Sequence, residues 1–442
     1  MTDTIFALAT PPGQSAIAIF RLSGPHLSKL ASQLSGAELH HRQAKPVRLY
    51  DEEGAVLDEV VLVYFEAPAS PTGEDVLEIH CHGSLAVIEA ITQTLSNMAD
   101  MRPALAGEFS RRAFDNGKFD LTEIEGLADL IEAQTDSQRR QALGQLQGIM
   151  RKKATSWRTQ IIHLAGQLES LIDFADEDLP DDVYQSFVSD RAQLIDSFKA
   201  ALADGARGEM IRNGVSVALM GPVNAGKSTA LNALAKRPAA IVSDEAGTTR
   251  DVIEVRLNLE GVAVILQDTA GIRDEAGTIE AIGIERAHQA AEEADLVIVI
   301  ADGAHADWYE TAEALCQRLN RPVIKIVNKK DKLPEESEIK EYLALSLYDE
   351  GDCALLEAEL LRYCRPLNSS AHQPVITRAR HRLLVEKALS ALEASCAVQL
   401  QEGPELIAEE LRAAADALGQ MTGQIDIEDI LSDIFTSFCI GK

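Results

Sequence analysis

Apolar residues in the first quarter of the chain come in short, β-like runs. Three such runs lie at Ala16–Leu22, Val56–Phe65 and Asp75–His80, and one helical stretch spans Leu85–Met98. Clusters of turn residues, including PPG, SGP and SPTGED, separate them, as turns separate the strands of small mixed domains. Residues 4–118 therefore predict a small α+β domain.

The pattern changes at about residue 121, and turn residues nearly vanish from there to about residue 212. Apolar positions such as Leu127, Leu130 and Ile131 now recur at spacings of three and four, which is the pattern of one face of an α-helix. This stretch predicts long helix. The same helical pattern returns from about Thr377 to Lys442.

Apolar runs and amphipathic segments alternate between the two helical stretches. This alternation predicts a mainly parallel sheet covered by helices, with one adjacent pair adding an antiparallel edge. Because helical pattern flanks the α/β unit on both sides, we expect the unit to be inserted into a helical domain. The predicted elements are strands at Val215–Met220, Val252–Leu259, Val262–Gln267, Leu296–Ala301 and Val323–Val327, with helices at Lys227–Lys236 and Gly283–Glu293.

Composition narrows the classes of function. The chain has 442 residues, 46% of them hydrophobic, and a formal charge of −29 with a pI near 4.7. Such a field repels nucleic acid and argues against a general nucleic-acid binder. The apolar runs are far shorter than the ~18 residues of a membrane span. With no secretory signal and no CxxC pair among six cysteines, we expect a cytoplasmic protein with reduced thiols and no membrane span.

A glycine-rich motif follows the first strand of the α/β unit and opens its first helix. Its sequence is Gly221-Pro-Val-Asn-Ala-Gly226-Lys227-Ser228, and this context predicts a phosphate-binding loop. Backbone N–H groups at a helix N-terminus would surround the phosphates, where the helix dipole favours an anion. We expect Lys227 to bridge the β- and γ-phosphates and the Ser228 hydroxyl to ligate Mg²⁺.

Two further motifs end later strands. In Asp268-Thr269-Ala270-Gly271 the aspartate can hold the metal through water, and the N–H of Gly271 can reach the γ-phosphate. In Asn328-Lys329-Lys-Asp331 the last carboxylate can accept both N1–H and the exocyclic amine of guanine, a pairing that adenine lacks. The order of the motifs predicts a GTP-binding domain. The expected fold is multidomain: an N-terminal α+β domain, an all-α helical domain and an inserted Ras-like α/β P-loop GTPase domain.

The segment between these motifs resembles a known class of GTPases. Gly247-Thr248-Thr249-Arg250-Asp251, together with Asn224 in the phosphate loop, is similar to the Era/TrmE class. The resemblance implies that Thr249 closes over Mg²⁺. Ile272 follows the DTAG motif where Ras-type enzymes carry a glutamine that positions water. The TrmE family uses a glutamate in the following loop instead, and the matching residue is Glu280.

The TrmE resemblance also implies a potassium ion, with ligands from Asn224, Ser243, Glu245 and Thr248. This ion would supply positive charge where an arginine finger acts in other GTPases, and its loop would form fully when two G domains of a homodimer meet. The implied catalytic residues are Glu280, Lys227 and Asp268. The expected GTP-binding residues are Asn224, Ala225, Gly226, Lys227, Ser228, Thr229, Ser243, Asp244, Glu245, Ala246, Gly247, Thr248, Thr249, Asp268, Thr269, Ala270, Gly271, Asn328, Lys329, Asp331 and Ser346. Leu347 follows Ser346 where alanine is usual.

The resemblance to the TrmE family extends over essentially the whole chain, through the motifs ATPPG, PTGEDVLEIHCHG, GEFSRRAFDNGKFDLTEIEGLADLIEAQT and FCIGK. It implies an N-terminal tetrahydrofolate-binding and dimerisation domain over residues 1–118. A helical domain would comprise residues 119–211 and 369–442, and the G domain residues 212–368. The ligand would be 5-formyl-tetrahydrofolate or a related one-carbon folate, bound by Arg21, Glu78, Lys118 and Lys442.

The family resemblance implies a function in tRNA modification. With an FAD- and NADH-using partner of the MnmG type, in a heterotetramer, the protein would install an aminomethyl or carboxymethylaminomethyl group at C5 of wobble uridine 34. FAD would lie on the partner only. Two alternatives are a ribosome-assembly GTPase of the Era type and a folate-responsive scaffold without hydrolysis. The first usually carries a basic RNA-binding module, which neither flank offers, and the intact G motifs argue against the second.

Three features have more than one interpretation. His80-Cys81-His82 suggests a metal site, but no second cluster of ligands completes tetrahedral zinc. Cys439 is either a thiol near the folate pocket or a packed cysteine at a helix end, and its context does not fit lipidation. The segment from Arg139 to Arg158 has six basic residues and no acidic one. It is either a solvated helix face or a contact for tRNA or a partner protein.

Overall fold

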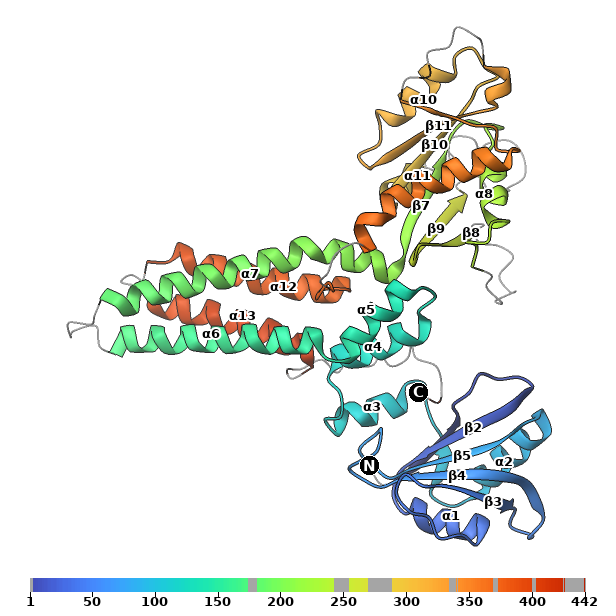
Figure 1. Ribbon diagram of the computed structural model, residues 1–442. Helices are drawn as coiled ribbons and strands as arrows, with labels where there is room; N and C mark the ends of the chain where they lie inside the picture. Colours follow the sequence, from blue (N-terminus) through green and yellow to red (C-terminus); the bar gives the residue numbers. More distant parts are fainter. Residues whose placement is uncertain are drawn as a thin grey trace, which may run out of the picture. The chain divides into compact units, whose positions relative to one another are not determined.

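The computed structural model describes residues 3–173, 181–241, 254–268, 288–333, 339, 341–368, 373–399, 403–423, 425 and 441 (Figure 1). The chain divides into two compact units. Unit 1 comprises residues 1–128 and 418–442, and unit 2 comprises residues 129–417.

Unit 1 contains the predicted α+β domain. Its strands are β1 (Thr4–Leu8), β2 (Ser15–Ser23), β3 (Ala44–Tyr50), β4 (Val56–Phe65), β5 (Val76–Gly83) and β6 (Met101–Pro103), and its helices include α1 (Leu27–Ser35), α2 (Leu85–Asn97) and α3 (Glu108–Asp115). The strands form one sheet in the order β3-β4-β5-β2-β1-β6. All neighbouring pairs are antiparallel except β1 and β6.

Helices cover both faces of this sheet. Leu22 of β2 and Ile79 of β5 belong to a core that includes Leu27 of α1 and Ile91 of α2. Phe6 of β1 joins the same core, whereas its neighbour Ile5 packs with Phe109 of α3. Successive residues of a strand point to opposite faces, so α1 and α2 lie on one face and α3 on the other.

A buried arginine joins three segments of unit 1. The side chain of Arg112 in α3 is 1% exposed, and it pairs with Glu74 at 2.8 Å and with both Asp3 and Glu108 at 3.2 Å. Arg102 adds a two-pronged pair to Glu108, at 2.8 and 2.6 Å. Burial opposes ionisation of Glu108, but the hydrogen bonds from the two arginines hold its pKa below the usual value.

Helices make up the first and last parts of unit 2. The predicted helical stretch over residues 121–212 is confirmed, and it divides into α4 (Leu121–Glu132), α5 (Asp136–Leu146), α6 (Ile149–Asp173) and α7 (Asp181–Asn213). Thr135 caps α5 in a capping box with Gln138, and Gly148, with φ of 77°, separates α5 from α6. These two signals lie inside an otherwise continuous helical pattern.

The helix α7 packs along both α6 and α12 (Ala379–Ala397), as Figure 1 shows. Trp157 of α6 stacks on Phe198 of α7 with ring centroids 4.3 Å apart, and its indole N–H donates to Ser197. Within the described residues, no helix is long and apolar enough to cross a membrane. The helix α13 (Pro404–Thr422) follows α12 in the chain.

The α/β part of unit 2 has the predicted alternation. Its elements are β7 (Val215–Met220), α8 (Lys227–Ala235), β8 (Glu254–Leu259), β9 (Val262–Asp268), β10 (Leu296–Asp302), α10 (Trp308–Cys316), β11 (Val323–Asn328), β12 (Leu343–Ala344) and α11 (Glu350–Asn368). The sheet order is β12-β11-β10-β7-β9-β8, and only β8 is antiparallel to its neighbour. The predicted strand at Val215–Met220 is confirmed to the residue. Of the predicted helix at Gly283–Glu293, residues 288–293 are helical, and residues 283–287 lie outside the described residues.

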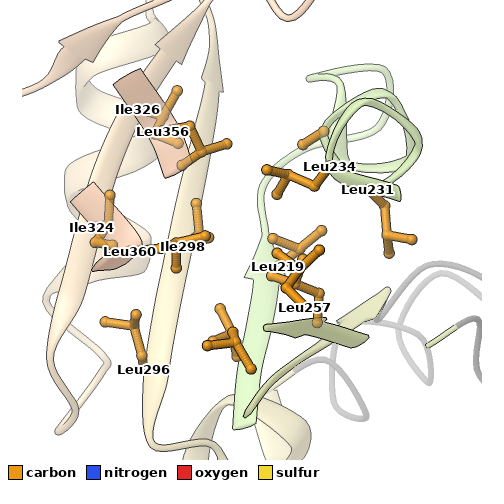
Figure 2. Packing of buried hydrophobic residues seen from close by; sticks show 14 of the residues in the cluster. Leu219, Leu231, Leu234, Leu257, Leu296, Ile298, Ile324, Ile326, Leu356 and Leu360 are labelled. Carbon is orange, nitrogen blue, oxygen red and sulfur yellow. The ribbon is translucent and has the colours of Figure 1, made fainter. Parts of the chain in front are cut away.

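Apolar side chains fill both faces of this sheet. On one face, Leu219 and Ile298 pack with Leu234 of α8 and Leu356 of α11 (Figure 2). On the other face, Met220 of β7 belongs to a second core with residues of α10. Strands that are covered on both faces are apolar at nearly every position, which explains why β7 and β10 were the clearest strands in the sequence.

The α/β unit is inserted into the helical part, as predicted. The chain enters it after α7 and leaves it after α11, and one carboxylate joins the two sides: Asp129 accepts from Arg212 at 2.8 Å and from Arg378 at 2.6 Å. A second contact joins the α5 residue Ser137 to the turn between β8 and β9. Its N–H donates to the Gly261 carbonyl at 3.2 Å, and its hydroxyl donates to Asn368 at 3.1 Å.

Replacing Arg112 with Met should destabilise unit 1 by about 3–5 kcal/mol, because it leaves the largely buried Glu74 without its ionic partner and removes one of the two arginines that pair with Glu108. Hydrogen exchange of the β1 and β2 amides in the full-length protein measures this loss. Arg111→Met on the same helix is the control, since Arg111 is 41% exposed and only 4.0 Å from Asp115. Equal protection in the two variants would show that the buried cluster does not hold the unit together.

Candidate functional site

The predicted nucleotide motifs meet at one edge of the unit 2 sheet. Parallel register places Leu219 of β7 beside Asp268 of β9, and Asp302 of β10 beside Asn328 of β11. The phosphate loop and the other motifs therefore leave the sheet from the same edge. The strand β7 lies between β9 and β10, where the strand order reverses, and ligands of open α/β sheets bind at such a position.

Two glycines allow the phosphate loop to approach its neighbours closely. A Cβ on Gly221 would lie 2.2 Å from the carbonyl oxygen of Ile300, and one on Gly226 would lie 2.2 Å from Nδ2 of Asn328. Both glycines have positive φ, 149° and 109°. Any side chain at either position would push the loop away from β10 or from Asn328.

The loop brings a cation and a helix N-terminus together. Lys227 begins α8, is 9% exposed, and donates from Nζ to the carbonyls of Gly221 at 2.7 Å and Pro222 at 3.0 Å. Ser228 is exposed in the first turn, Thr229 is half-buried, Ala225 is buried, and Asn224 is exposed with φ of 63°. This arrangement suits a phosphate anion, and it leaves a hydroxyl beside the position of that anion.

Asn328 links the phosphate loop to the loop before α11. Its side chain is buried, Nδ2 donates to the Ala225 carbonyl at 2.8 Å, and Oδ1 accepts the N–H of Leu347 at 3.1 Å. Leu347 is 2% exposed and belongs to the core with α8 and α11. The leucine in the usual alanine position is therefore part of the core.

Two carboxylates hold the neighbouring lysines. Lys329, with φ of 60°, donates from Nζ to Oδ2 of Asp302 at 2.5 Å, and Lys330 pairs with Asp352 at 2.6 Å. Burial opposes ionisation of both aspartates, but the lysines and backbone N–H groups hold the pKa of each below its usual value. Asp352 also accepts the N–H of Ser346 at 2.6 Å, and Asp331 is exposed.

A separate polar cluster lies on the unit 1 sheet. Arg21 and Glu78 are partners across β2 and β5, and the guanidinium donates to Glu78 Oε1 at 3.1 and 2.9 Å. His80 lies 3.2 Å from the other carboxylate oxygen. Lys118 has a different partner, the Pro68 carbonyl at 2.9 Å. The structure thus brings together two of the residues that the resemblance assigns to folate.

The His80-Cys81-His82 segment lies on β5 with alternating side chains. Cys81 is buried and donates to the Ala18 carbonyl, and burial raises the pKa of its thiol to about 11. His82 pairs with Asp58 at 2.8 Å. Across the part of the chain that the structure describes, no group of three or more His, Cys, Asp or Glu side chains could hold a metal ion.

Two family models match the sequence. Residues 4–118 match the model of the GTP-binding protein TrmE N-terminus, and residues 121–439 match that of the MnmE helical domain. The tRNA modification GTPase MnmE of Parvibaculum lavamentivorans is 46% identical over 445 residues, with both chains covered completely. The chain belongs to the MnmE family of tRNA modification GTPases. The Caulobacter vibrioides member is 45% identical over 455 residues, also with complete coverage.

Membership of the MnmE family decides between the alternatives that the sequence left open. The protein is a GTP hydrolase with an N-terminal TrmE-type domain, a helical domain and a P-loop G domain. Family membership therefore favours tRNA modification over Era-type ribosome assembly and over a scaffold without hydrolysis.

Solved structures match smaller parts of the chain. The G domain of the Thermotoga maritima iron transporter FeoB is 21% identical, covers 34% of this chain and 98% of its own, and has a TM-score of 0.27. Aquifex aeolicus Era bound to GDP and AlF4⁻ is 26% identical, covers 42% of this chain and 67% of its own, and has a TM-score of 0.25.

Several residues that the MnmE family resemblance assigns to the site lie outside the described residues. Asp268 is placed by its backbone as the last residue of β9. The others are Ser243, Asp244, Glu245, Ala246, Gly247, Thr248, Thr249, Thr269, Ala270, Gly271, Glu280, Cys439 and Lys442.

Stability of the G domain should fall in acid because of Asp302 and Asp352. A carboxylate with a lowered pKa in the folded state stabilises the fold above its unfolded pKa, here about 3.8. That stabilisation disappears as the pH falls through the folded value. The melting temperature of the parent protein should therefore fall more steeply from about pH 5 to pH 3 than that of the double variant D302N/D352N. Parallel pH profiles would contradict this assignment.

Proposed function

We propose that this GTPase, with an FAD-using partner of the MnmG type, adds an aminomethyl or carboxymethylaminomethyl group at C5 of uridine 34 of certain tRNAs. The observation that carries the proposal is the match, over complete chains at 46% identity, to a relative named tRNA modification GTPase MnmE. FAD belongs to the partner in this proposal. The chain itself supplies a nucleotide site and a folate site.

The roles proposed for the G domain are those that its motifs imply, and the contacts of Lys227 support the first of them. Lys227 bridges the β- and γ-phosphates, and the hydroxyl of Ser228 is an oxygen ligand of the kind that Mg²⁺ prefers. Asp331 accepts the N1–H and amine of guanine, and Asp268 holds the metal through water. Thr249 and Glu280 keep the roles implied by the resemblance, as a second Mg²⁺ ligand and as the residue that orients water.

A potassium ion is proposed between the phosphate loop and residues 243–248. The exposed amide of Asn224, on a residue with φ of 63°, offers an oxygen at the surface of the phosphate loop. Ser243, Glu245 and Thr248 would complete the ligands. Closure of this loop when two G domains of a homodimer meet would couple GTP hydrolysis to a change in domain arrangement.

The N-terminal domain is proposed to bind a one-carbon folate and to dimerise. Arg21 and Glu78 support this role, because their side chains are 28% and 15% exposed on one sheet face and combine a cation with a carboxylate. A guanidinium can pair with the glutamate tail of folate, and a carboxylate can hydrogen-bond the pterin edge. Lys118 and Lys442 would add further positive charge.

Mass spectrometry of wobble uridines tests the proposed reaction. A strain that lacks the gene should accumulate uridine 34 without the C5 group, and the wild-type gene should restore it. Lys227→Ala should fail to restore it, since the phosphate contact is lost. Lys236→Ala, at the other end of α8, is the control and should restore it. Full modification in the deletion strain would exclude the proposed function.

GTP hydrolysis should be several-fold faster in KCl than in NaCl at equal ionic strength, because the proposed ion supplies transition-state charge. Asn224→Ala should remove the difference between the two salts. Asn320→Ala is a matched control, since Asn320 is exposed and precedes β11 at the opposite edge of the sheet. The potassium mechanism is wrong if the two salts give the same rate and Asn224→Ala is harmless.

A further inference from the structure

Lys329 is fixed at its far end by a carboxylate that no nucleotide motif contains. Its Nζ lies 2.5 Å from Oδ2 of Asp302, whose side chain is 4% exposed, whereas the Lys329 side chain is 28% exposed. The lysine follows Asn328, the residue that joins the phosphate loop to the loop before α11. The stem of the lysine therefore runs between the anchored backbone of that motif and the end of β10.

The position of Asp302 follows from the parallel register of the sheet. Asp302 ends β10 directly beside Asn328 of β11, and the Gly303 N–H donates to the Asn328 carbonyl at 2.9 Å. A Cβ on Gly303 would lie 2.8 Å from that same oxygen, so only glycine permits this approach. The ends of the two strands are joined immediately beyond the aspartate.

The carboxylate is also oriented before any ligand binds. Its Oδ1 accepts the N–H of Ala304 at 3.0 Å, which directs Oδ2 toward Lys329. His305 lies 3.7 Å from Oδ2, but 69% of its side chain is exposed. Among the residues that the structure describes, the contact with Asp302 determines where the Lys329 ammonium lies.

A buried ion pair is a poor source of stability, since removing two charges from water costs about as much as their attraction returns. Lys329 also has φ of 60°, a region that non-glycine residues seldom adopt. Both features are expected where the geometry of a binding site, rather than the stability of the fold, depends on them. They lie between Asn328 and the exposed Asp331, where the guanine base is proposed to bind.

We propose that Asp302 is a positioning residue for guanine nucleotides. By holding the ammonium of Lys329 at the end of β10, it keeps the methylene stem of the lysine extended as an apolar surface for one face of the base. Asp331 recognises the edge of the base, whereas Asp302 acts through Lys329 and does not discriminate between bases that differ at that edge. The inference rests on the proposed base site at Asn328 to Asp331.

Loss of the carboxylate should affect the lifetime of the bound nucleotide more than the chemistry. Without Asp302 the long side chain of Lys329 gains rotamer freedom that binding must remove again. Asp302→Asn should raise the dissociation rate of ribose-labelled GDP from the full-length protein by about tenfold. It should raise KM for GTP by a similar factor and leave kcat within about twofold, because the contacts of the Asp302 carboxylate are with Lys329, Ala304 and His305.

A double-mutant cycle separates positioning from a general effect on the fold. If Asp302 acts through Lys329, the variant D302N/K329M should release GDP no faster than K329M alone, within about twofold. Multiplied effects of the two single changes would overturn the proposal, as would an unchanged dissociation rate for D302N. Glu313→Gln is the matched control. It removes a 2.8 Å ion pair with Lys325 of β11, the strand that Lys329 follows, and should leave GDP release unchanged.

Affinities of D302N and K329M for two nucleotides separate the role of Asp302 from the proposed base site itself. D302N should lower the affinity for GDP and for inosine diphosphate by the same factor. The two bases present the same ring faces and differ only in one exocyclic amine at the edge. If K329M leaves the affinity for GDP unchanged, the proposed base site itself is wrong. If K329M weakens GDP binding and D302N does not, the base site stands and the role of Asp302 is overturned.

Discussion

The side-chain amide of Asn328 is the contact on which the nucleotide edge of the G domain depends. One amide satisfies a carbonyl of the phosphate loop and an N–H of the loop before α11, two segments more than a hundred residues apart. Because a buried polar group without a partner is costly, the three segments are held together. Gly226 of the phosphate loop has no Cβ that would clash with this amide. The amide therefore fixes the position of the phosphate loop relative to the proposed base site.

Fold prediction from the sequence succeeded in segments where a single pattern of apolar residues, that of a strand or that of a helix, dominates. The strand at Val215–Met220 is apolar at every position but Ser216 and is followed by Gly221, so its bounds were evident. The helical pattern over residues 121–212 did not give the ends of the individual helices, because a capping threonine at 135 and a glycine at 148 are weak signals inside a strong helical pattern. The strand β12, with only two residues, is too short for any periodicity to predict.

Site prediction depended on whether the residues are neighbours in the chain. Lys227 and Asn328 belong to compact motifs, and the structure brings those motifs together. Asp302 carries no such signal: it is the last residue of an apolar strand, and only the register with β11 places it beside Lys329. Arg21 and Glu78 are 57 residues apart, and the family resemblance, not their spacing, assigned both of them to the folate site.

The insertion of the G domain has a mechanical consequence. A domain attached by one chain connection can rotate about it. The G domain is instead attached by two chain connections, whose Arg212 and Arg378 both pair with Asp129, and by the turn at Gly261. Rotation about either connection must break hydrogen bonds at Ser137 or ion pairs at Asp129. Each hydrogen bond contributes about 1 kcal/mol, so together these contacts oppose rotation of the G domain about its two connections.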